Sequence, residues 1–274
     1  MPCYRCFTST LALAASLLVG LPVAAADVTA ESSPPGVIPG DDGWTFSIAP
    51  YFWAASLKGD IGVRGRQPFD ADVPFRDIFD NLRFGGMIVG EAHNGTWGVF
   101  ADLIYLDIEV DKSLTRTIAG VPVSLSGSLE TTSVTATLMG EYRVLAEPSA
   151  TLDLMAGARV WSVDNELDIA LSAGGPPLAA FSGSDTQTWV DPMLGVRGRV
   201  DLSPSWHLTG WGMIGGFGAA SDFSWDVLGA IGYQWTKSLS IVGGYRAVGV
   251  DYSSDGFTFD VIEHGPIIGA VLRF

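Results

Sequence analysis

Polar and apolar residues alternate with a period of two along most of this chain, most plainly in its last segment, residues 257–274. One set of alternate positions is apolar, as at Ile268 and Leu272, and the intervening set is mixed, as at Glu263 and Arg273. A strand of this kind needs a partner on both edges and an apolar medium against one face, and a closed transmembrane β-barrel supplies both. The segment therefore predicts the closing strand of such a barrel.

Similar alternation recurs upstream and predicts about ten strands in all. We place them at residues 44–58, 82–93, 96–111, 128–144, 150–168, 185–202, 206–219, 223–235, 239–252 and 257–274. The connections at residues 94–95, 147–149, 203–205 and 236–238 are short, whereas those at 59–81, 112–127 and 172–184 are long. Short turns on one rim and longer loops on the other are typical of bacterial outer-membrane barrels. The sequence predicts an all-β fold, a closed antiparallel transmembrane β-barrel, over residues 44–274.

The N-terminus is typical of an export signal. Arg5 supplies a positive charge, residues 11–21 form an apolar core, and residues 24–26 form a small-residue cleavage site. We expect residues 1–26 to be a Sec-type signal peptide. Residues 27–43 are rich in Pro, Gly, Ser and Asp and predict a disordered periplasmic leader.

Composition narrows the classes of partner and cofactor. The formal net charge of −15 disfavours nucleic acid as a partner. Cys3 and Cys6 both lie in the predicted signal peptide, so we expect neither a disulfide nor a cysteine-ligated metal. Residues 251–256 are similar to a calcium loop, but its twelfth position is Ile262, which carries no carboxylate. We therefore expect no metal and no other cofactor.

The predicted signal, the alternating strands, the short turns and the terminal Phe274 resemble the small outer-membrane β-barrel proteins of Gram-negative bacteria. The resemblance covers residues 44–274 and implies a protein of the outer membrane, in contact with its lipid and lipopolysaccharide. It also implies that Phe274 is the signal read by the barrel-assembly machinery. We expect a monomer.

If the apolar faces meet lipid, the opposite faces line the lumen, and they carry charges of both signs. The expected lumen residues are Glu91, Asp107, Glu109, Glu141, Arg143, Asp153, Arg159, Asp191, Arg197, Arg199, Asp201, Asp226, Arg246, Glu263 and Arg273. Buried charges require pairing, and barrels of about eight strands are filled by side chains whereas aqueous channels need about 16 strands. Two functions stay open: a structural envelope protein with a charge network in its lumen, and a narrow porin-like path for ions or small solutes.

The first long connection contains a helical pattern. Phe75, Ile78, Phe79 and Leu82 share one helical face, and Pro74 suits a first helical turn. An amphipathic helix needs an apolar surface to cover. We expect this one to lie over the barrel mouth.

An outer-membrane enzyme acting on lipid A, other lipids or peptides is the alternative function. Proteases of the omptin family use an Asp/His pair at the outer rim, but this sequence has no Asp-x-His. His93 and His207 fall beside predicted periplasmic turns, and His264 falls on a lipid-facing position. Glu91 and His93 share a face and could form an acid/base pair. We expect no catalytic residues.

Overall fold

The computed structural model describes residues 43–62, 69–118, 121–173 and 175–274, and all structural statements below concern these ranges. The predicted signal peptide, residues 1–26, and residues 27–42 of the predicted leader lie outside them. The described elements are β1 (Thr45–Trp53), β2 (Ser56–Gly62), β3 (Phe69–Val73), α1 (Phe75–Asp80), β4 (Leu82–His93), β5 (Trp97–Ile118), β6 (Val121–Glu147), β7 (Ala150–Ala173), β8 (Pro177–Asp201), β9 (Trp206–Gly215), β10 (Phe223–Gln234), β11 (Leu239–Ser254) and β12 (Phe257–Arg273).

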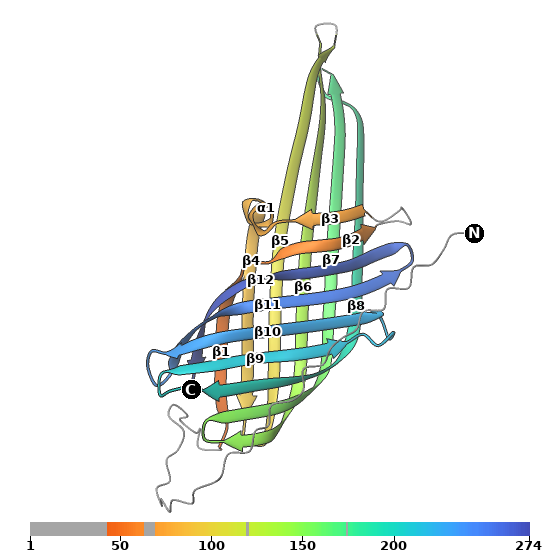
Figure 1. Ribbon diagram of the computed structural model, residues 1–274. Coiled ribbons are helices and arrows are strands. Elements are labelled where there is room, and N and C mark those ends of the chain that lie inside the picture. Colours follow the sequence, from red (N-terminus) through yellow and green to blue (C-terminus); the bar gives the residue numbers. More distant parts are fainter. Residues whose placement is uncertain (1–42, 63–68, 119–120, 174) are drawn as a thin grey trace, which may run out of the picture. The chain divides into compact units, whose positions relative to one another are not determined.

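Ten of these strands close into a ring. The order is β1-β4-β5-β6-β7-β8-β9-β10-β11-β12, and β12 pairs back with β1. In Figure 1, β9–β12 cross the strands of the opposite wall at a wide angle, as tilted strands of a barrel do. The prediction of a closed antiparallel barrel of about ten strands is confirmed.

β2 and β3 lie outside the ring and replace part of the predicted first loop. β1 and β2 both pair with β12, but they are separate strands because Ala54 and Ala55, which lie between them, are not in strand conformation. Gly265 faces this break, and a Cβ on it would come within 1.9 Å of the Ala54 carbonyl oxygen. The single strand predicted over residues 44–58 is therefore two strands, and β3 pairs with the second.

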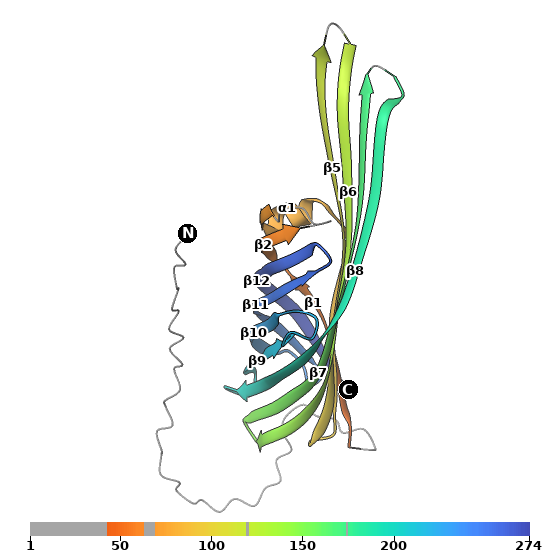
Figure 2. The same cartoon turned by 90° about the vertical axis from the view of Figure 1, so that its right-hand side faces the viewer.

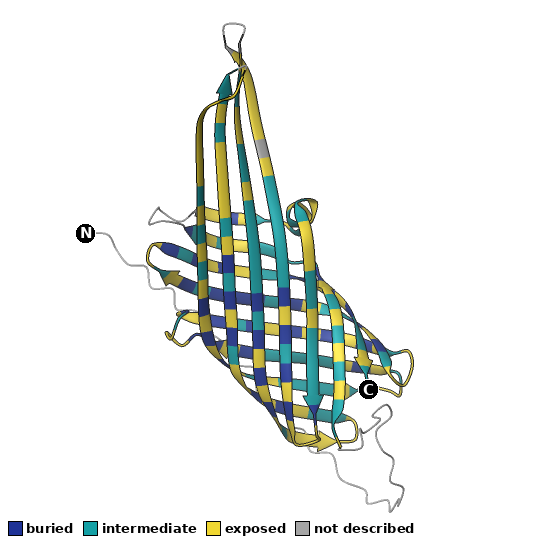
Figure 3. Cartoon of the chain, turned by 180° about the vertical axis from the view of Figure 1, so that it is seen from behind, coloured by how far each residue is buried: buried dark blue, intermediate teal, exposed yellow. Residues whose placement is uncertain are grey.

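The outward positions of the ring carry an apolar band. In β10, exposed residues alternate with buried or half-buried ones, and Figure 3 shows the same alternation around the barrel. The exposed set includes Phe46, Ile48, Ile88, Leu103, Leu138, Val160, Leu194, Val227, Ile231 and Ile268. Exposed Trp97 contacts Tyr142 at the periplasmic rim, with ring centroids 4.8 Å apart. An apolar band with aromatic residues at its edge is what a lipid bilayer requires of a barrel.

β5 to β8 extend far beyond the other strands (Figure 2). β4 ends opposite Ile108 of β5, and β9 ends opposite Met193 of β8. Beyond these points β5 to β8 pair only with one another, and we call this part the projecting sheet. It comprises residues 109–118, 121–132, 163–173 and 177–188.

The predicted loops at residues 112–127 and 172–184 are therefore wrong over most of their length. Their serine and glycine content is typical of loops, yet alternation persists through them, with Leu114 paired to Leu125 and Leu125 paired to Leu171. Strand pairing and this alternation override the local composition.

The polarity of the sheet inverts where it leaves the barrel. The outward row of Leu103, Ala136, Val160 and Val190 is apolar. Four residues further out, the paired row of Asp107, Thr132, Asp164 and Thr186 is polar. The face that continues the lumen carries the exposed apolar residues Leu114, Leu125, Leu129, Leu167, Ile169, Leu171 and Phe181, with a polar row of Thr131, Asn165 and Asp185 among them. We infer that the outer boundary of the membrane lies between the two rows.

Two substitutions on the outward face of β8 test this boundary. We expect Leu194→Arg to lower the free energy of unfolding by about 2–4 kcal/mol, because it places a cation against the hydrocarbon core. Thr186→Arg lies on the same face beyond the boundary and should cost about 0–1 kcal/mol. The measurement is denaturant unfolding from lipid vesicles, and equal costs would contradict the assignment.

Candidate functional site

Inward side chains fill the barrel in four tiers. From the rim with the short turns, which the sequence predicts to be periplasmic, they are the periplasmic tier (Glu91, His93, Glu141, Arg143, Asp153 and Arg197), the methionine tier (Phe100, Met139, Met155, Met193 and Met213), the central tier (Tyr51, Asp102, Arg159, Asp226 and Arg246) and the aromatic tier (Trp161, Trp189, Tyr252, Phe257 and Phe259). The order can be followed along β7, where Asp153, Met155, Arg159 and Trp161 are successive buried residues.

Arg246 of β11 organises the central tier. Its Nη2 lies 2.6 Å from Asp102 Oδ2 and 2.7 Å from Asp226 Oδ2, and its Nη1 donates to the Tyr51 hydroxyl at 2.6 Å. Tyr51 in turn donates to Asp102 at 2.8 Å. These four residues come from β1, β5, β10 and β11, so the network ties opposite walls of the barrel together.

Arg159 completes this network from β7. Its Nη2 contacts Asp226, and its Nε donates to Thr137 Oγ1 at 2.8 Å. The indole of Trp211 donates to Asp226 at 2.9 Å. Two guanidinium groups thus meet two carboxylates with almost no exposure to solvent. Balanced pairing of this kind is what burial of four charges requires.

The methionine tier separates the central tier from the periplasmic tier. Phe100 and Met139 are fully buried, and Met193 is 1% exposed. Trp211 packs against Phe100, with ring centroids 5.4 Å apart. Flexible methionine side chains fill irregular spaces well, and this apolar layer interrupts the polar lining of the lumen.

The aromatic tier lies at the outer end of the lumen. Trp189 stacks on Tyr252 at 4.0 Å and on Trp161 at 5.9 Å between ring centroids. Its indole donates to Ser221, which also binds the carboxylate of Asp191 at 2.7 Å. This contact holds the loop between β9 and β10 against β8.

The periplasmic tier contains two ion-pair groups. Arg197 lies 2.7 Å from Glu91 and 3.7 Å from Glu141. Arg143 binds Asp153 with two hydrogen bonds, of 2.8 and 3.0 Å. His93 Nδ1 accepts a hydrogen bond from Gly95, which leaves Nε2 to face Asp153 at 3.5 Å.

The structure pairs most of the expected lumen residues with one another or with a polar neighbour. It brings together Glu91, Glu141 and Arg197, then Arg143 and Asp153, and pairs Arg199 with Asp201. Asp226 and Arg246 join Arg159, and Asp191 binds Ser221. Arg273 donates to Gln234. Glu263 faces inward on β12, and no ion pair is formed by it within the described ranges.

Asp107 and Glu109 correct the sequence assignment for β5. Both face outward and lie near Arg83, at 3.9 and 3.4 Å. The inward positions of β5 are the even ones, as buried Phe100, Asp102 and Ile104 show. Asp102 and Tyr51 were therefore missed as lumen residues, although the correct parity of each strand would have identified them.

The helix α1 does not lie over the barrel mouth. Phe75 and Phe79 pack edge-on against Phe52, with centroids 5.8 and 6.4 Å away, and Phe52 is an outward residue of β1. Ile78 and Leu82 are half-buried, and no residue of α1 is buried. The helix therefore lies at the outer wall, near the inferred membrane boundary.

Two further residues singled out from the sequence lie on the outside of the barrel. Phe274 stacks on Phe46 at 6.2 Å between ring centroids, and the backbones of the two residues exchange hydrogen bonds of 2.9 and 3.0 Å. His264 contacts the hydroxyl of Tyr245 at 2.7 Å, on the outward face. His207 is buried near the periplasmic rim.

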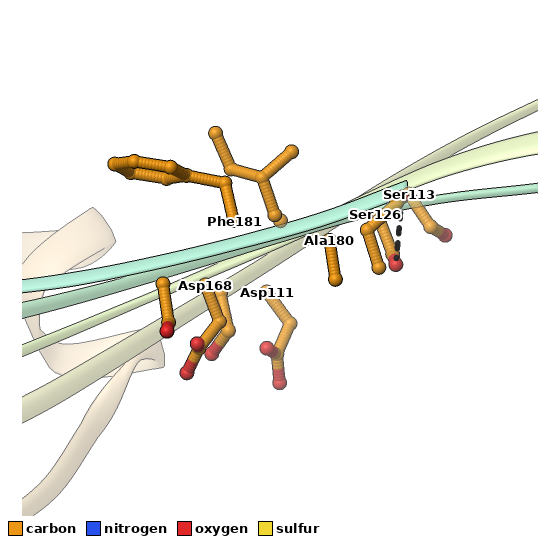
Figure 4. A pocket seen from close by; sticks show the side chains of 11 residues that line it. Asp111, Ser113, Ser126, Asp168, Ala180 and Phe181 are labelled. Carbon is orange, nitrogen blue, oxygen red and sulfur yellow. Dashed lines mark hydrogen bonds between the residues drawn. The ribbon is translucent and has the colours of Figure 1, made fainter. Parts of the chain in front are cut away.

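The outer face of the projecting sheet gathers six carboxylates, those of Glu109, Asp111, Glu130, Asp164, Glu166 and Asp168, and Asp107 lies just below them on the same face. Glu130 lies directly opposite both Glu109 and Glu166. The neighbouring carboxylates of Asp107, Glu130 and Glu109 raise the pKa of the Arg83 guanidinium. Figure 4 shows Asp111 and Asp168 on one side of the sheet and Phe181 on the other, around a pocket that includes Ser126.

Comparison with protein-family models and with curated proteins gave no match. Among solved structures, the outer membrane protease OmpT from Escherichia coli is similar at 13% identity and a TM-score of 0.54, over 86% of this chain and 98% of that one. The translocator domain of the autotransporter NalP from Neisseria meningitidis aligns at 13% identity and a TM-score of 0.42, over 84% and 88%. Ail from Yersinia pestis aligns at 14% and 0.30, over 85% and 99%.

The likeness to OmpT and the closed ring of strands confirm the predicted fold, a β-barrel of the kind found in bacterial outer-membrane proteins. Together with the apolar band, the fold supports the expected localisation in the outer membrane. At this level of identity the likeness to OmpT shows the fold alone.

We expect Arg246→Leu to lower the free energy of unfolding by about 3–5 kcal/mol, because it leaves two buried carboxylates short of a partner. Arg83→Leu removes a rim cation of similar size and should cost about 1 kcal/mol or less. Denaturant unfolding in vesicles measures both variants. Equal losses would contradict the central role of Arg246.

Proposed function

We propose that this protein is a sealed, non-enzymatic outer-membrane barrel that holds the projecting sheet outside the cell as a surface for binding. The barrel supplies the anchor and the orientation. The sheet supplies an extended surface that water and external molecules reach.

The filled lumen is the observation that carries the proposal. A solute that entered from the periplasm would meet the paired Arg197 and Arg143 groups, then the methionine tier, then the Arg246 network. The stacked rings around Trp189 lie beyond them. Arg197 joins β8 to β4 in the first of these tiers, and Arg246 joins β11 to β5 and β10 in the central tier, which favours the structural function over a narrow porin-like path.

The form of the projecting sheet supports the binding role. Four strands continue in register beyond the barrel, with exposed apolar residues on one face and carboxylates on the other. Exposed apolar patches of more than a few hundred Å² commonly mark interaction sites. A purely structural anchor has no need of such a surface.

We expect the full-length protein to give no discrete conductance steps in planar bilayers, because the side chains of the four tiers block ion passage. Insertion is checked separately by its heat-modifiable migration on a gel. Steps of constant size that change on Arg246→Ala would contradict the sealed barrel and favour a narrow path.

Cysteine labelling in intact cells tests the orientation. We expect Ser126→Cys, in the projecting sheet, to react with a membrane-impermeant maleimide. Ser238→Cys, in a short turn at the opposite rim, should react only after the outer membrane is permeabilised. Both serines are exposed in the structure, so a difference in labelling reports the side of the membrane and not burial of the side chain. If only Ser238→Cys were labelled in intact cells, the barrel would have the opposite orientation in the membrane.

A further inference from the structure

The helix α1 joins two strand ends that do not pair with each other. The pairing of β1 with β4 ends at Pro50, opposite Ile88. Within the described ranges, residues 51–53 of β1 and 82–87 of β4 continue past this point without pairing together. The rings of α1 pack on Phe52 of β1, and the chain then leads from α1 into β4. The helix therefore bridges an interruption in the outer part of the barrel wall, and Figure 1 shows it at the outer end of β4.

This interruption begins at the inferred membrane boundary. Ile88 lies in the apolar outward row of Leu103, whereas Phe84 lies in the polar row of Asp107. A strand edge without partners is not stable against hydrocarbon, because lipid offers its amides and carbonyls no hydrogen bonds. The wall therefore needs a cover wherever lipid reaches this part of β4.

Phe84 shows that lipid does reach it. The side chain of Phe84 is 61% exposed, although its neighbours along the row, Asp107, Thr132 and Asp164, are polar. Its ring packs on Tyr105, with ring centroids 5.8 Å apart. Exposed aromatic residues gather where the wall of such a barrel crosses the membrane interface. This pair indicates that lipid extends further out along β4 than along β6 and β7.

α1 has the composition of a helix that lies in a membrane interface. Phe75, Ile78 and Phe79 form its apolar side, and Phe79 is 54% exposed. The other side is charged, and Arg76 pairs with Asp80 there at 3.6 Å. A helix with one apolar and one charged side lies along the interface, with the apolar side toward the acyl chains.

We propose that α1 and Phe84 form an interfacial anchor that binds the acyl chains of lipid in the outer leaflet. Phe79 and Phe84 enter the outer edge of the hydrocarbon region, and the charged side of α1 stays in water. The anchor covers the interruption between β1 and β4 where the wall meets lipid. This inference goes beyond the proposed function and does not depend on the binding role of the projecting sheet.

Continuity with the apolar band identifies lipid as the occupant. Phe46, Ile48 and Phe52 are exposed on the outward side of β1, and the rings of α1 pack on the last of them. The interfacial anchor thus extends the lipid-facing surface of the barrel. A second copy of this chain or another protein would have to displace lipid from the same surface in order to bind there.

Fluorescence quenching in vesicles tests the contact with lipid. The full-length chain, with Cys3 and Cys6 replaced by serine, carries a single introduced cysteine labelled with a small fluorescent group. The vesicles are phosphatidylcholine, with or without a quenching nitroxide on the acyl chain. We expect Phe79→Cys to be quenched as strongly as Ile88→Cys in the apolar band. Asp77→Cys, exposed on the charged side of α1, should be quenched less.

Ser126→Cys, exposed in the projecting sheet, gives the level of quenching for a side chain in water. If Phe79→Cys were quenched no more than Ser126→Cys, the anchor would not contact acyl chains and the inference would be wrong. Analytical ultracentrifugation of the same samples identifies the other occupant. A dimer in which Phe79→Cys is shielded from the nitroxide would make a second copy the occupant and would also overturn the inference.

Hydrogen exchange tests the cover. We expect Phe79→Ser with Phe84→Ser to remove protection from amide exchange in residues 85–87 of β4, measured by mass spectrometry in the same vesicles. Leu178→Ser with Phe181→Ser removes two exposed apolar side chains from the projecting sheet and should leave this exchange unchanged. Phe79→Ser alone serves if the first double variant does not insert. Exchange in residues 85–87 that is the same in both kinds of variant would contradict the covering role of the anchor.

Discussion

Closure of the backbone hydrogen-bond ladder is the constraint on which the rest of this structure depends. Within a bilayer, no water is present to bond to an unpaired strand edge, so the strands that cross it must form a complete ring. The pairing of β12 with β1 meets that requirement. Irregular features occur where water is available: the break at Ala54 and Ala55, the β2–β3 pair and the projecting sheet.

Closure leaves a lumen, and the way it is filled decides the type of protein. A ring of ten strands has too many inward positions to leave empty and too few to enclose a wide channel. Here the inward positions alternate between charged and apolar tiers along the strands. Arg246 and Arg159 neutralise Asp102 and Asp226 across the barrel, so the charges connect walls that backbone hydrogen bonds do not join.

The membrane also explains why the two faces of β5 to β8 exchange character. Inside the bilayer the outer face meets lipid, and the inner face meets the polar tiers. Beyond the boundary the outer face meets water, so Asp164 and Glu166 follow Val160 along one side of β7. The opposite side carries Trp161, Val163 and Leu167, with Asn165 between the last two, and no element of the described ranges covers its outer part.

The sequence by itself determined the class of fold, the number of strands in the ring and the band of apolar outward residues, because a period of two is a local property of the chain. It also determined that inward charges had to be paired. Only the tertiary structure decided the partners, since Tyr51, Asp102, Asp226 and Arg246 come from strands distant in sequence. It likewise decided that α1 packs on Phe52 outside the barrel and that residues 112–118 and 121–127 are strand. A helix pattern does not specify what it covers, and serine-rich strands outside a membrane lack the strong apolar signal of those inside it.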